Sequence, residues 1–215
     1  MDRSLKLSEK LFCLAVNPKR GGIFLSASTT LAMTLTGSVF IELMNKKVIS
    51  MENGLVHLVD PTFQSDEIYD FFLHRISASN KDRKLRSWIS RFNVRGRKIQ
   101  RHFIRTLVRK RVLRTEVRRI LFIPYEKVFV MDQELVEKIR KEVEDIFMKR
   151  VELTIDATIL ASMVEQTNLL SRIFPERAQR REARRFLKSL PEMPVPKAVH
   201  EAIQMMHAAV FAATT

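Results

Sequence analysis

Apolar residues recur every three or four positions along most of the chain, the spacing that places them on one face of an α-helix. Residues that favour helix N-termini, such as Ser8, Asp66 and Asp132, stand just before several of these stretches. The segments that this pattern predicts as helices are Ser8–Val16, Ser26–Lys46, Ser65–Ile76, a short helix around Trp88–Phe92, Arg97–Arg111, Asp132–Arg150, Thr154–Phe174 and an Ala- and Met-rich final helix. Two of them, Ser26–Lys46 and Thr154–Phe174, are apolar on most sides. We therefore expect those two at the centre of a helical bundle.

Short apolar runs interrupt the helical pattern in two places. In the first, Val48-Ile49 and Leu55–Val59 flank the pair Asn53-Gly54. An Asn-Gly pair between apolar runs favours a tight two-residue turn, so this segment is predicted to form a β-hairpin.

The second interruption lies in the middle of the chain. Ile120–Ile123 and Val128–Val130 bracket Pro124–Lys127, which is predicted to be the turn of a second hairpin. The expected fold class is therefore all-α, mainly a helical bundle around central apolar helices, with one or two small β-hairpins. At this length, residues 1–215 are expected to form a single domain.

The charge of the chain is strongly segregated. Lys and Arg number 38 against 24 Asp and Glu, a formal net charge of +14. Residues 1–80 balance at eight basic and eight acidic residues, whereas residues 81–119 hold sixteen basic residues and two acidic ones. Twelve of those sixteen are Arg, whose planar guanidinium suits phosphate oxygens. The composition therefore indicates an anionic partner, with phosphate-bearing partners favoured.

Within this basic segment, Arg97, Arg101, Arg105 and Arg109 recur at every fourth position, so they share one face of the predicted helix. Like charges at this spacing repel by about 0.2–0.5 kcal/mol per pair. A bound anion would relieve that repulsion. We therefore predict that the four arginines bind lipid headgroups; a solvated basic face that merely aids solubility is the alternative.

Catalytic and metal-binding patterns are missing from the sequence. It contains no nucleotide-binding glycine loop, no nucleophile elbow and no zinc-protease motif, and its five histidines lack zinc-ligand spacing. The lone Cys13 lies in an apolar stretch and reads as a buried structural residue. We expect a protein that is not an enzyme and that needs no cofactor or metal.

No targeting or membrane-spanning segment is recognisable. The N-terminal residues lack the regions of a secretory signal. The longest uncharged run, Gly21–Ile41, contains seven Ser or Thr and three Gly, too many for a confident span. The expected location is the cytoplasm, with peripheral attachment to the cytoplasmic face of a membrane.

Several segments, in their order and spacing, resemble the Golgi phosphoprotein 3 family over nearly the whole chain. They are Gly37–Leu43 followed by Lys46–Ile49, Trp88-Ile89, Leu107–Leu113 leading into Leu121-Phe122, then Asp156, Leu160, Arg177, Arg181 and the closing Val199–Ala213. The resemblance implies a helical bundle with a protruding hairpin at residues 120–130. It also implies a peripheral membrane protein that reads phosphatidylinositol 4-phosphate and acts as an adaptor, as the family does in retaining glycosyltransferases.

The resemblance also assigns a lipid pocket, and this chain departs from it. The family's tryptophan and first arginine fall on Ala27 and Thr36. Of its two later arginines, one is retained as Arg97 and the other falls on Gln100. These departures identify a distant member, for which a Golgi location follows only if the source is eukaryotic.

Three hypotheses for function follow. The first is peripheral binding to anionic phospholipid or phosphoinositide headgroups through the arginine row, with the hairpin residues Leu121, Phe122, Ile123 and Tyr125 dipping into the membrane. Those hairpin residues could equally pack into the core or join two copies into a homo-oligomer. The alternative is nucleic-acid binding, because a basic helix before a hairpin resembles a winged helix. The third is an adaptor whose arginines hold an acidic protein tail.

Overall fold

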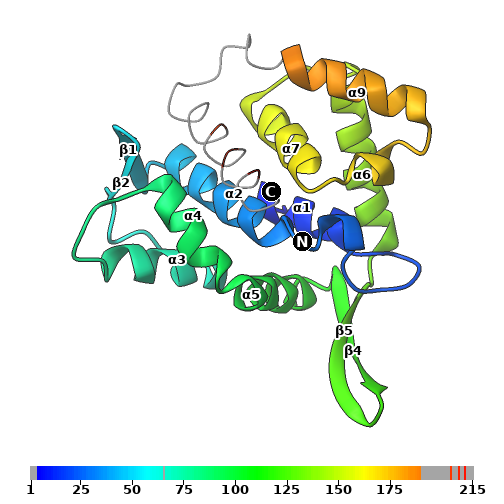
Figure 1. Cartoon of the computed structure of the whole chain (residues 1–215), viewed down its shortest axis with the longest axis horizontal. Coiled ribbons are helices and arrows are strands. Elements are labelled where there is room, and N and C mark those ends of the chain that lie inside the picture. Colours follow the sequence, from blue (N-terminus) through cyan, green and yellow to red (C-terminus); the bar gives the residue numbers. More distant parts are fainter. Residues whose placement is uncertain (1–3, 65, 190–203, 205–207, 209–210, 212–215) are drawn as a thin grey trace.

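The computed structural model describes residues 4–64, 66–189, 204, 208 and 211 (Figure 1). These residues are mainly helical. The helices are α1 (Leu7–Ala15), α2 (Leu31–Asn45), α3 (Glu67–Ser77), α4 (Leu85–Asn93), α5 (Gly96–Arg109), α6 (Gln133–Phe147), α7 (Ile155–Gln166), α8 (Leu170–Ile173) and α9 (Arg177–Ser189). The strands are β1 (Ile49–Glu52), β2 (Leu55–Leu58), β3 (Arg83–Lys84), β4 (Leu113–Ile120) and β5 (Ile123–Val130). The predicted fold class, a helical bundle with small hairpins, is confirmed.

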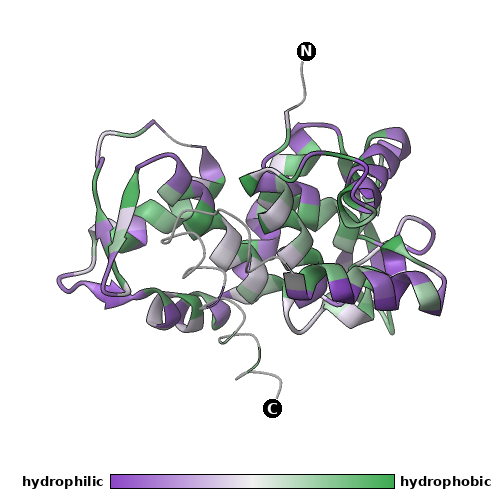
Figure 2. Ribbon diagram, turned by 90° about the horizontal axis from the view of Figure 1, so that it is seen from above, coloured by the Kyte–Doolittle hydropathy of each residue, from purple (hydrophilic) through white to green (hydrophobic). Residues whose placement is uncertain are grey.

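Helix α2 is the centre of the bundle. It contacts α1, α4, α5 and α7, and every residue from Leu31 to Leu43 is buried. Its hydroxyl groups are satisfied within the helix; Thr36 Oγ1, for example, donates to the carbonyl of Ala32 at 2.8 Å. The outer helices carry hydrophilic and hydrophobic residues on opposite sides, as Figure 2 shows for the ribbons around the rim. The centre of the bundle is therefore built from a helix without a polar face.

An aromatic cluster joins α2, α3 and α4. Phe72 and Phe92 stack with ring centroids 4.3 Å apart, and Phe40 contacts both rings and Trp88. Aromatic pairs of this kind add about 0.5–1.5 kcal/mol each beyond the area they bury. The cluster fixes the position of α4, which carries several of the basic side chains.

The structure confirms some of the predicted helix starts and contradicts one of them. The cap predicted at Asp132 is confirmed, since its side chain accepts from the backbone N–H of Leu135. Asp66, one of the residues predicted to open its helix, is the N-cap of α3 and accepts from the N–H groups of Ile68 and Tyr69. The cap predicted at Ser8 is wrong.

Ser8 lies inside α1, which begins at Leu7 after Lys6. The Ser8 N–H and Oγ both donate to the buried carboxylate of Glu42, at 2.7 and 3.1 Å. A tertiary hydrogen-bond partner on α2 therefore takes the place of the local capping role.

The first hairpin is confirmed, with one addition. Asn53 and Gly54 form the turn between β1 and β2, with φ of 52° and 76°. Both residue types tolerate this left-handed conformation. Strand β3 pairs with β2 and makes a sheet of three strands. With two residues, β3 is too short to show an alternating pattern.

The second hairpin exists, but its predicted strands and turn are wrong. The turn is Leu121-Phe122, and Pro124–Lys127 lies within β5. The pairing begins at the buried pair Leu113 and Val130 and runs without a break to Ile120 and Ile123. Packing at the base therefore sets the register, and the register places two bulky residues in the turn, with φ of 46° and 71°.

Two predicted helices are shorter than expected. The Ser26–Lys46 segment begins with a 3₁₀ turn at Leu25–Ala27, and α2 starts only at Leu31. The Thr154–Phe174 segment divides into α7 and α8, because Asn168 adopts a left-handed φ of 53° between them. The final helix predicted near Val199–Ala213 lies outside the continuously described residues.

Candidate functional site

The arginine row is positioned by the buried face of α5. Ile99, Phe103 and Leu107 are almost fully buried, and Phe103 stacks on Phe12 of α1 with centroids 5.5 Å apart. Once this apolar stripe faces the core, the other side of the helix must face solvent. The structure accordingly exposes the four predicted arginines, Arg97, Arg101, Arg105 and Arg109.

The four arginines line one groove together. The groove has a volume of about 1090 Å³ and runs between α5 and the β4–β5 hairpin. Its other lining residues are Glu67, Ile104, Val108, Thr115, Pro124, Tyr125 and Glu126. The structure therefore brings the predicted basic row beside one predicted hairpin residue, Tyr125.

The groove is not purely basic. The Glu67 carboxylate of α3 accepts a hydrogen bond from Arg109 Nη2 at 2.5 Å and lies 2.9 Å from His102 Nδ1. Its carboxylate is also 3.9 Å from Arg105 Nη1. Arg97 and Arg101 form no ion pair with a carboxylate of the described residues. The unneutralised end of the row is therefore the end nearer the start of α5.

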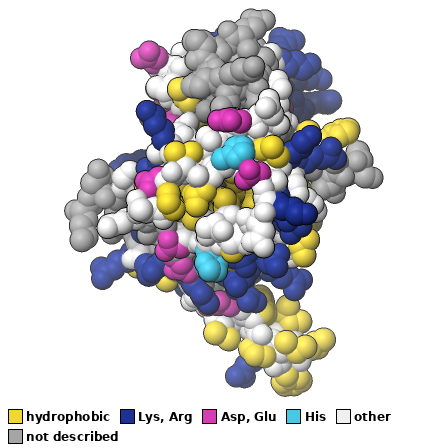
Figure 3. All heavy atoms as spheres, turned by 90° about the vertical axis from the view of Figure 1, so that its left-hand side faces the viewer, with side chains coloured by type: hydrophobic (Ala, Val, Ile, Leu, Met, Phe, Trp, Pro, Cys, Tyr) yellow, Lys and Arg dark blue, Asp and Glu magenta, His cyan; other side chains and the backbone are white. Residues whose placement is uncertain are grey.

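The hairpin projects from the bundle (Figure 1). The residues at its far end are apolar. Two eight-residue strands span roughly 26 Å. Phe122 is 94 % exposed and Leu121 86 % exposed, with Ile120 and Ile123 exposed beside them. In Figure 3 the hydrophobic side chains gather at the lower end of the molecule, with Lys and Arg above them. Exposed apolar clusters of this size are typical of surfaces that bind a protein or a membrane.

The base of the hairpin belongs to the core. Val128 and Val130 are buried, while Leu121, Phe122 and Ile123 contact no core cluster. Core packing and self-association were the two alternatives to membrane contact for the apolar hairpin residues. Core packing is wrong for Leu121, Phe122 and Ile123.

The positions that the resemblance assigns to a lipid pocket are only partly accessible. Ala27 and Thr36 are fully buried. Arg97 and Gln100 line a second hollow of about 540 Å³ between the start of α2 and the start of α5, which shares Arg97 and Arg101 with the groove. Gly96 allows this close approach, since a Cβ there would lie 2.9 Å from Ala32 Cβ. Half of the family's pocket positions therefore face a hollow.

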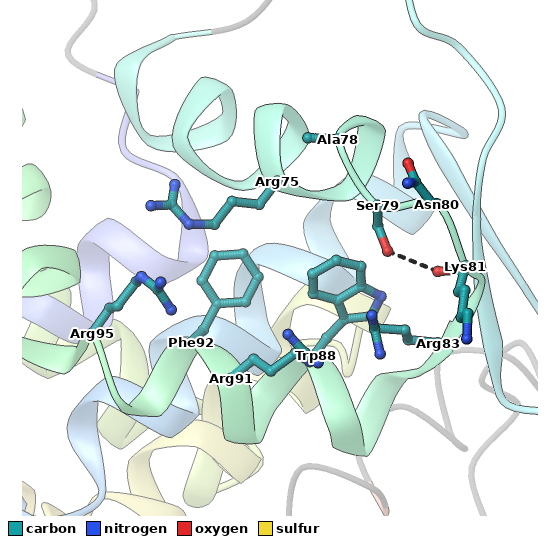
Figure 4. Close-up of a pocket in the computed structure, with 10 residues that line it drawn as sticks. All are labelled: Arg75, Ala78, Ser79, Asn80, Lys81, Arg83, Trp88, Arg91, Phe92 and Arg95. Carbon is teal, nitrogen blue, oxygen red and sulfur yellow. Dashed lines mark hydrogen bonds between the residues drawn. The ribbon is translucent and has the colours of Figure 1, made fainter.

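A third hollow was missed by the sequence reasoning. It holds about 400 Å³ and is lined by side chains from the end of α3, the 79–83 segment and α4 (Figure 4). Five of its lining residues are basic. Four of them belong to the basic 81–119 segment of the sequence, whereas Arg75 lies outside that segment. No sequence spacing places these residues together.

Other chemistry is sparse in the described part of the chain. There, no three His, Cys, Asp or Glu side chains lie close enough to hold a metal ion. Cys13 is fully buried, and burial raises the pKa of its thiol. Among the described helices, none has the length and apolar character needed to cross a bilayer.

The comparison with protein families finds a match over most of the chain. The family model described as Golgi phosphoprotein 3 (GPP34) matches residues 7–206 of the chain. No individually curated protein matches it.

Proposed function

The chain belongs to the Golgi phosphoprotein 3 (GPP34) family, and on this premise we propose that it binds anionic membranes through the arginine groove of α5 and the apolar tip of the β4–β5 hairpin. The family consists of non-enzymatic adaptors that bind lipid, and membership implies a peripheral membrane role with recognition of phosphatidylinositol 4-phosphate. What this chain adds is a specific arrangement of charge and apolar surface. The proposal treats residues 1–215 as one domain on the cytoplasmic face of a membrane.

The observation that carries the proposal is the position of the hairpin beside the arginine row. Tyr125, Pro124 and Glu126 line the same groove as the four arginines, and the strands continue outward to the exposed Leu121 and Phe122. Arginines near an anionic surface contribute about 1 kcal/mol each. Apolar side chains that enter the membrane interface add a favourable binding free energy proportional to the area they bury. The two contributions act together when the hairpin tip enters the lipid beside the charged groove.

The departures at Ala27, Thr36 and Gln100 bear on specificity. Thr36 Oγ1 is buried and already bonded within α2, so it offers a headgroup no charge. Of the family's pocket, Arg97 remains as a cation at the surface. We therefore propose that charge density, more than a single phosphoinositide pocket, decides which membrane the groove binds.

Vesicle flotation tests the proposal. We expect the chain to float with vesicles that contain phosphatidylserine or phosphatidylinositol 4-phosphate and to stay behind with vesicles of phosphatidylcholine alone. The variant Arg101→Glu/Arg105→Glu should bind roughly a hundredfold more weakly, since two favourable charges become unfavourable.

The matched control is Arg181→Glu/Arg185→Glu, which changes the net charge equally on α9. Both of those residues are exposed, and α9 lies at the opposite end of the molecule from the hairpin tip (Figure 1). If the two variants lose affinity equally, the groove has no special role. If the chain binds duplex DNA or acidic peptides but no vesicle, the membrane proposal fails in favour of a nucleic-acid or adaptor role. A second copy joined through the hairpin would appear as a concentration-dependent mass in solution.

A further inference from the structure

The hollow between α3 and α4 is a site separate from the groove. Its lining shares no residue with the groove, and it shares Arg95 with the hollow at the start of α5. Its volume of about 400 Å³ falls within the range of small-molecule sites. It therefore has room for a ligand the size of a phosphorylated sugar or a lipid headgroup.

The charge around this hollow has one sign. Its lining contains five basic side chains and no acidic one: Arg75, Lys81, Arg83, Arg91 and Arg95. None of the five forms an ion pair with a carboxylate of the described residues. Partial burial, and after it the nearby charge of Arg95, lower the pKa of Arg75. Cations gathered without counterions repel one another, and a bound anion reduces that repulsion.

Arg75 is held in place by its surroundings. Its guanidinium lies over the ring of Phe71 at 4.2 Å and donates to the Phe71 carbonyl at 3.3 Å. The remaining N–H groups of the guanidinium stay available for a ligand, since it carries five donors. In Figure 4, Arg75 extends from α3 and Arg95 from the segment after α4, and both side chains lie beside Phe92.

A second, independent observation comes from Trp88. Its side chain is buried, with the residue 5 % exposed, and its indole Nε1–H has no hydrogen-bond partner among the described residues. Phe40 and Phe92 pack against the indole, with centroids 6.4 and 5.9 Å away. In Figure 4 the nitrogen edge of the indole is turned toward the segment that carries Ser79 and Arg83. A buried donor without a partner costs free energy, and a ligand oxygen in the hollow would satisfy it.

We propose that this hollow binds a phosphate monoester, with the guanidinium groups of Arg75, Arg91 and Arg95 and the indole N–H of Trp88 as donors. Four of the five cations are Arg, which contacts phosphate oxygens with two parallel N–H groups. The monoester carries close to two negative charges near neutral pH, which matches the crowded cations better than a carboxylate does. The phosphate belongs to a soluble compound or to a lipid headgroup; the chemistry is shared, and the experiment separates the two sources.

The single tryptophan of the chain makes the test direct. The one indole N–H resonance, and the one source of tryptophan fluorescence, both report on Trp88. We expect the indole resonance to shift and saturate when inositol 1,4-bisphosphate is added to the full chain. Inorganic phosphate should move it in the same direction at higher concentration.

Variants locate the binding. Arg75→Gln/Arg91→Gln should weaken inositol 1,4-bisphosphate binding by about tenfold or more, as expected for losing charged hydrogen bonds. The control Arg181→Gln/Arg185→Gln removes the same charge from α9. It should change the affinity for inositol 1,4-bisphosphate by less than about twofold, which is the effect of net charge alone. Equal losses in both variants would overturn the proposal, because they would show attraction by the whole molecule.

The source of the phosphate is read from two arms. Saturation by inositol 1,4-bisphosphate in solution, with no further response when vesicles containing phosphatidylinositol 4-phosphate are added in its place, identifies a soluble ligand. A fluorescence response confined to vesicles that contain phosphatidylinositol 4-phosphate identifies a headgroup. If the indole responds in neither arm, the proposal is wrong, even when flotation shows that the groove binds membranes. These measurements on the unmodified chain decide the question if the double variant does not fold.

Discussion

Arg109 of α5 donates to Glu67 of α3 across 2.5 Å, so the predicted basic row is partly neutralised by a carboxylate from another helix. The same carboxylate lies 3.9 Å from Arg105 and 2.9 Å from His102. Glu67 therefore lowers the positive potential at one end of the groove, and its removal should raise affinity for an anionic surface.

The variant Glu67→Gln should bind vesicles containing phosphatidylserine about fivefold more tightly, the effect of about one further basic charge at the surface. Flotation or sedimentation with a lipid titration measures the change. Glu134→Gln is the control, since Glu134 also lies in the first turn of a helix and also pairs with a basic side chain, Lys138, at 2.8 Å. Unchanged or weaker binding by Glu67→Gln would show that the carboxylate orients the arginines more than it opposes the lipid.

The hairpin turn offers a clean separation of folding from membrane contact. Leu121 and Phe122 occupy φ values close to those of Asn53 and Gly54 in the first hairpin. Replacing Leu121-Phe122 by Asn-Gly should therefore keep or raise the melting temperature, because Asn and Gly adopt this conformation with less strain. The same change should weaken vesicle binding by about tenfold or more, since it removes two large apolar side chains from the interface.

The control for the hairpin is Leu121→Ile, which keeps an apolar residue while retaining strain in the turn. It should bind vesicles nearly as well as the unmodified chain and should unfold at a lower temperature. If Asn-Gly leaves vesicle binding intact, the tip does not enter the membrane. Loss of a concentration-dependent oligomer in the Asn-Gly variant would instead assign the tip to self-association.

Buried Glu42 should make the folded state less stable as pH rises. Desolvation raises its pKa above the ordinary value of 4.5, although hydrogen bonds from Ser8 and Tyr69 oppose the shift. Above pH 4.5 the unfolded chain loses this proton while the folded chain keeps it. The free energy of unfolding therefore falls by up to about 1.4 kcal/mol per pH unit, until the pH passes the raised folded pKa.

This contribution is isolated by urea unfolding of the unmodified chain and of Glu42→Gln at several pH values between roughly 5 and 8, above the ordinary pKa of a glutamate. The stability of the variant relative to the unmodified chain should rise with pH and then level off. Tyr69→Phe removes one donor to the carboxylate and should strengthen the pH dependence. A difference between the two chains that is independent of pH would mean that Glu42 ionises equally in the folded and unfolded states.

Two neighbouring glycines test how the base of the hairpin is fixed. Gly21 and Gly22 both have left-handed φ, of 67° and 74°. A Cβ on Gly21 would lie 2.5 Å from Phe129 Cε1 and 2.8 Å from the Val128 carbonyl, whereas a Cβ on Gly22 meets its nearest atom, of Lys127, at 3.8 Å. Gly22→Ala should cost about 1 kcal/mol from backbone strain alone.

Gly21→Ala should cost the same strain and roughly 1–3 kcal/mol more, because rigid neighbours must move. Chemical denaturation of the two variants measures the difference. Equal destabilisation would show that the hairpin base shifts freely to accept a methyl group.

The parts of the fold that follow from local pattern could be predicted. Asp66 and Asp132 cap their helices, Asn53-Gly54 forms a turn, and the spacing of Ile99, Phe103 and Leu107 gives the buried face of α5. Each depends on interactions within a few residues. The Leu121-Phe122 turn could not be predicted, because its position is set by the distant buried pair Leu113 and Val130.

Local patterns in the sequence are enough to predict a helical bundle, a segregated basic segment and an arginine row on one helix face, because helical periodicity and net charge are properties of neighbouring residues. The contact between Glu67 and Arg109, the apolar tip beside the row, and the hollow that Arg75 and Arg91 share with Trp88 all result from packing between distant elements. These relationships join different helices. They depend on how apolar faces pack around α2, and packing brings together side chains whose separation along the chain carries no periodic signal.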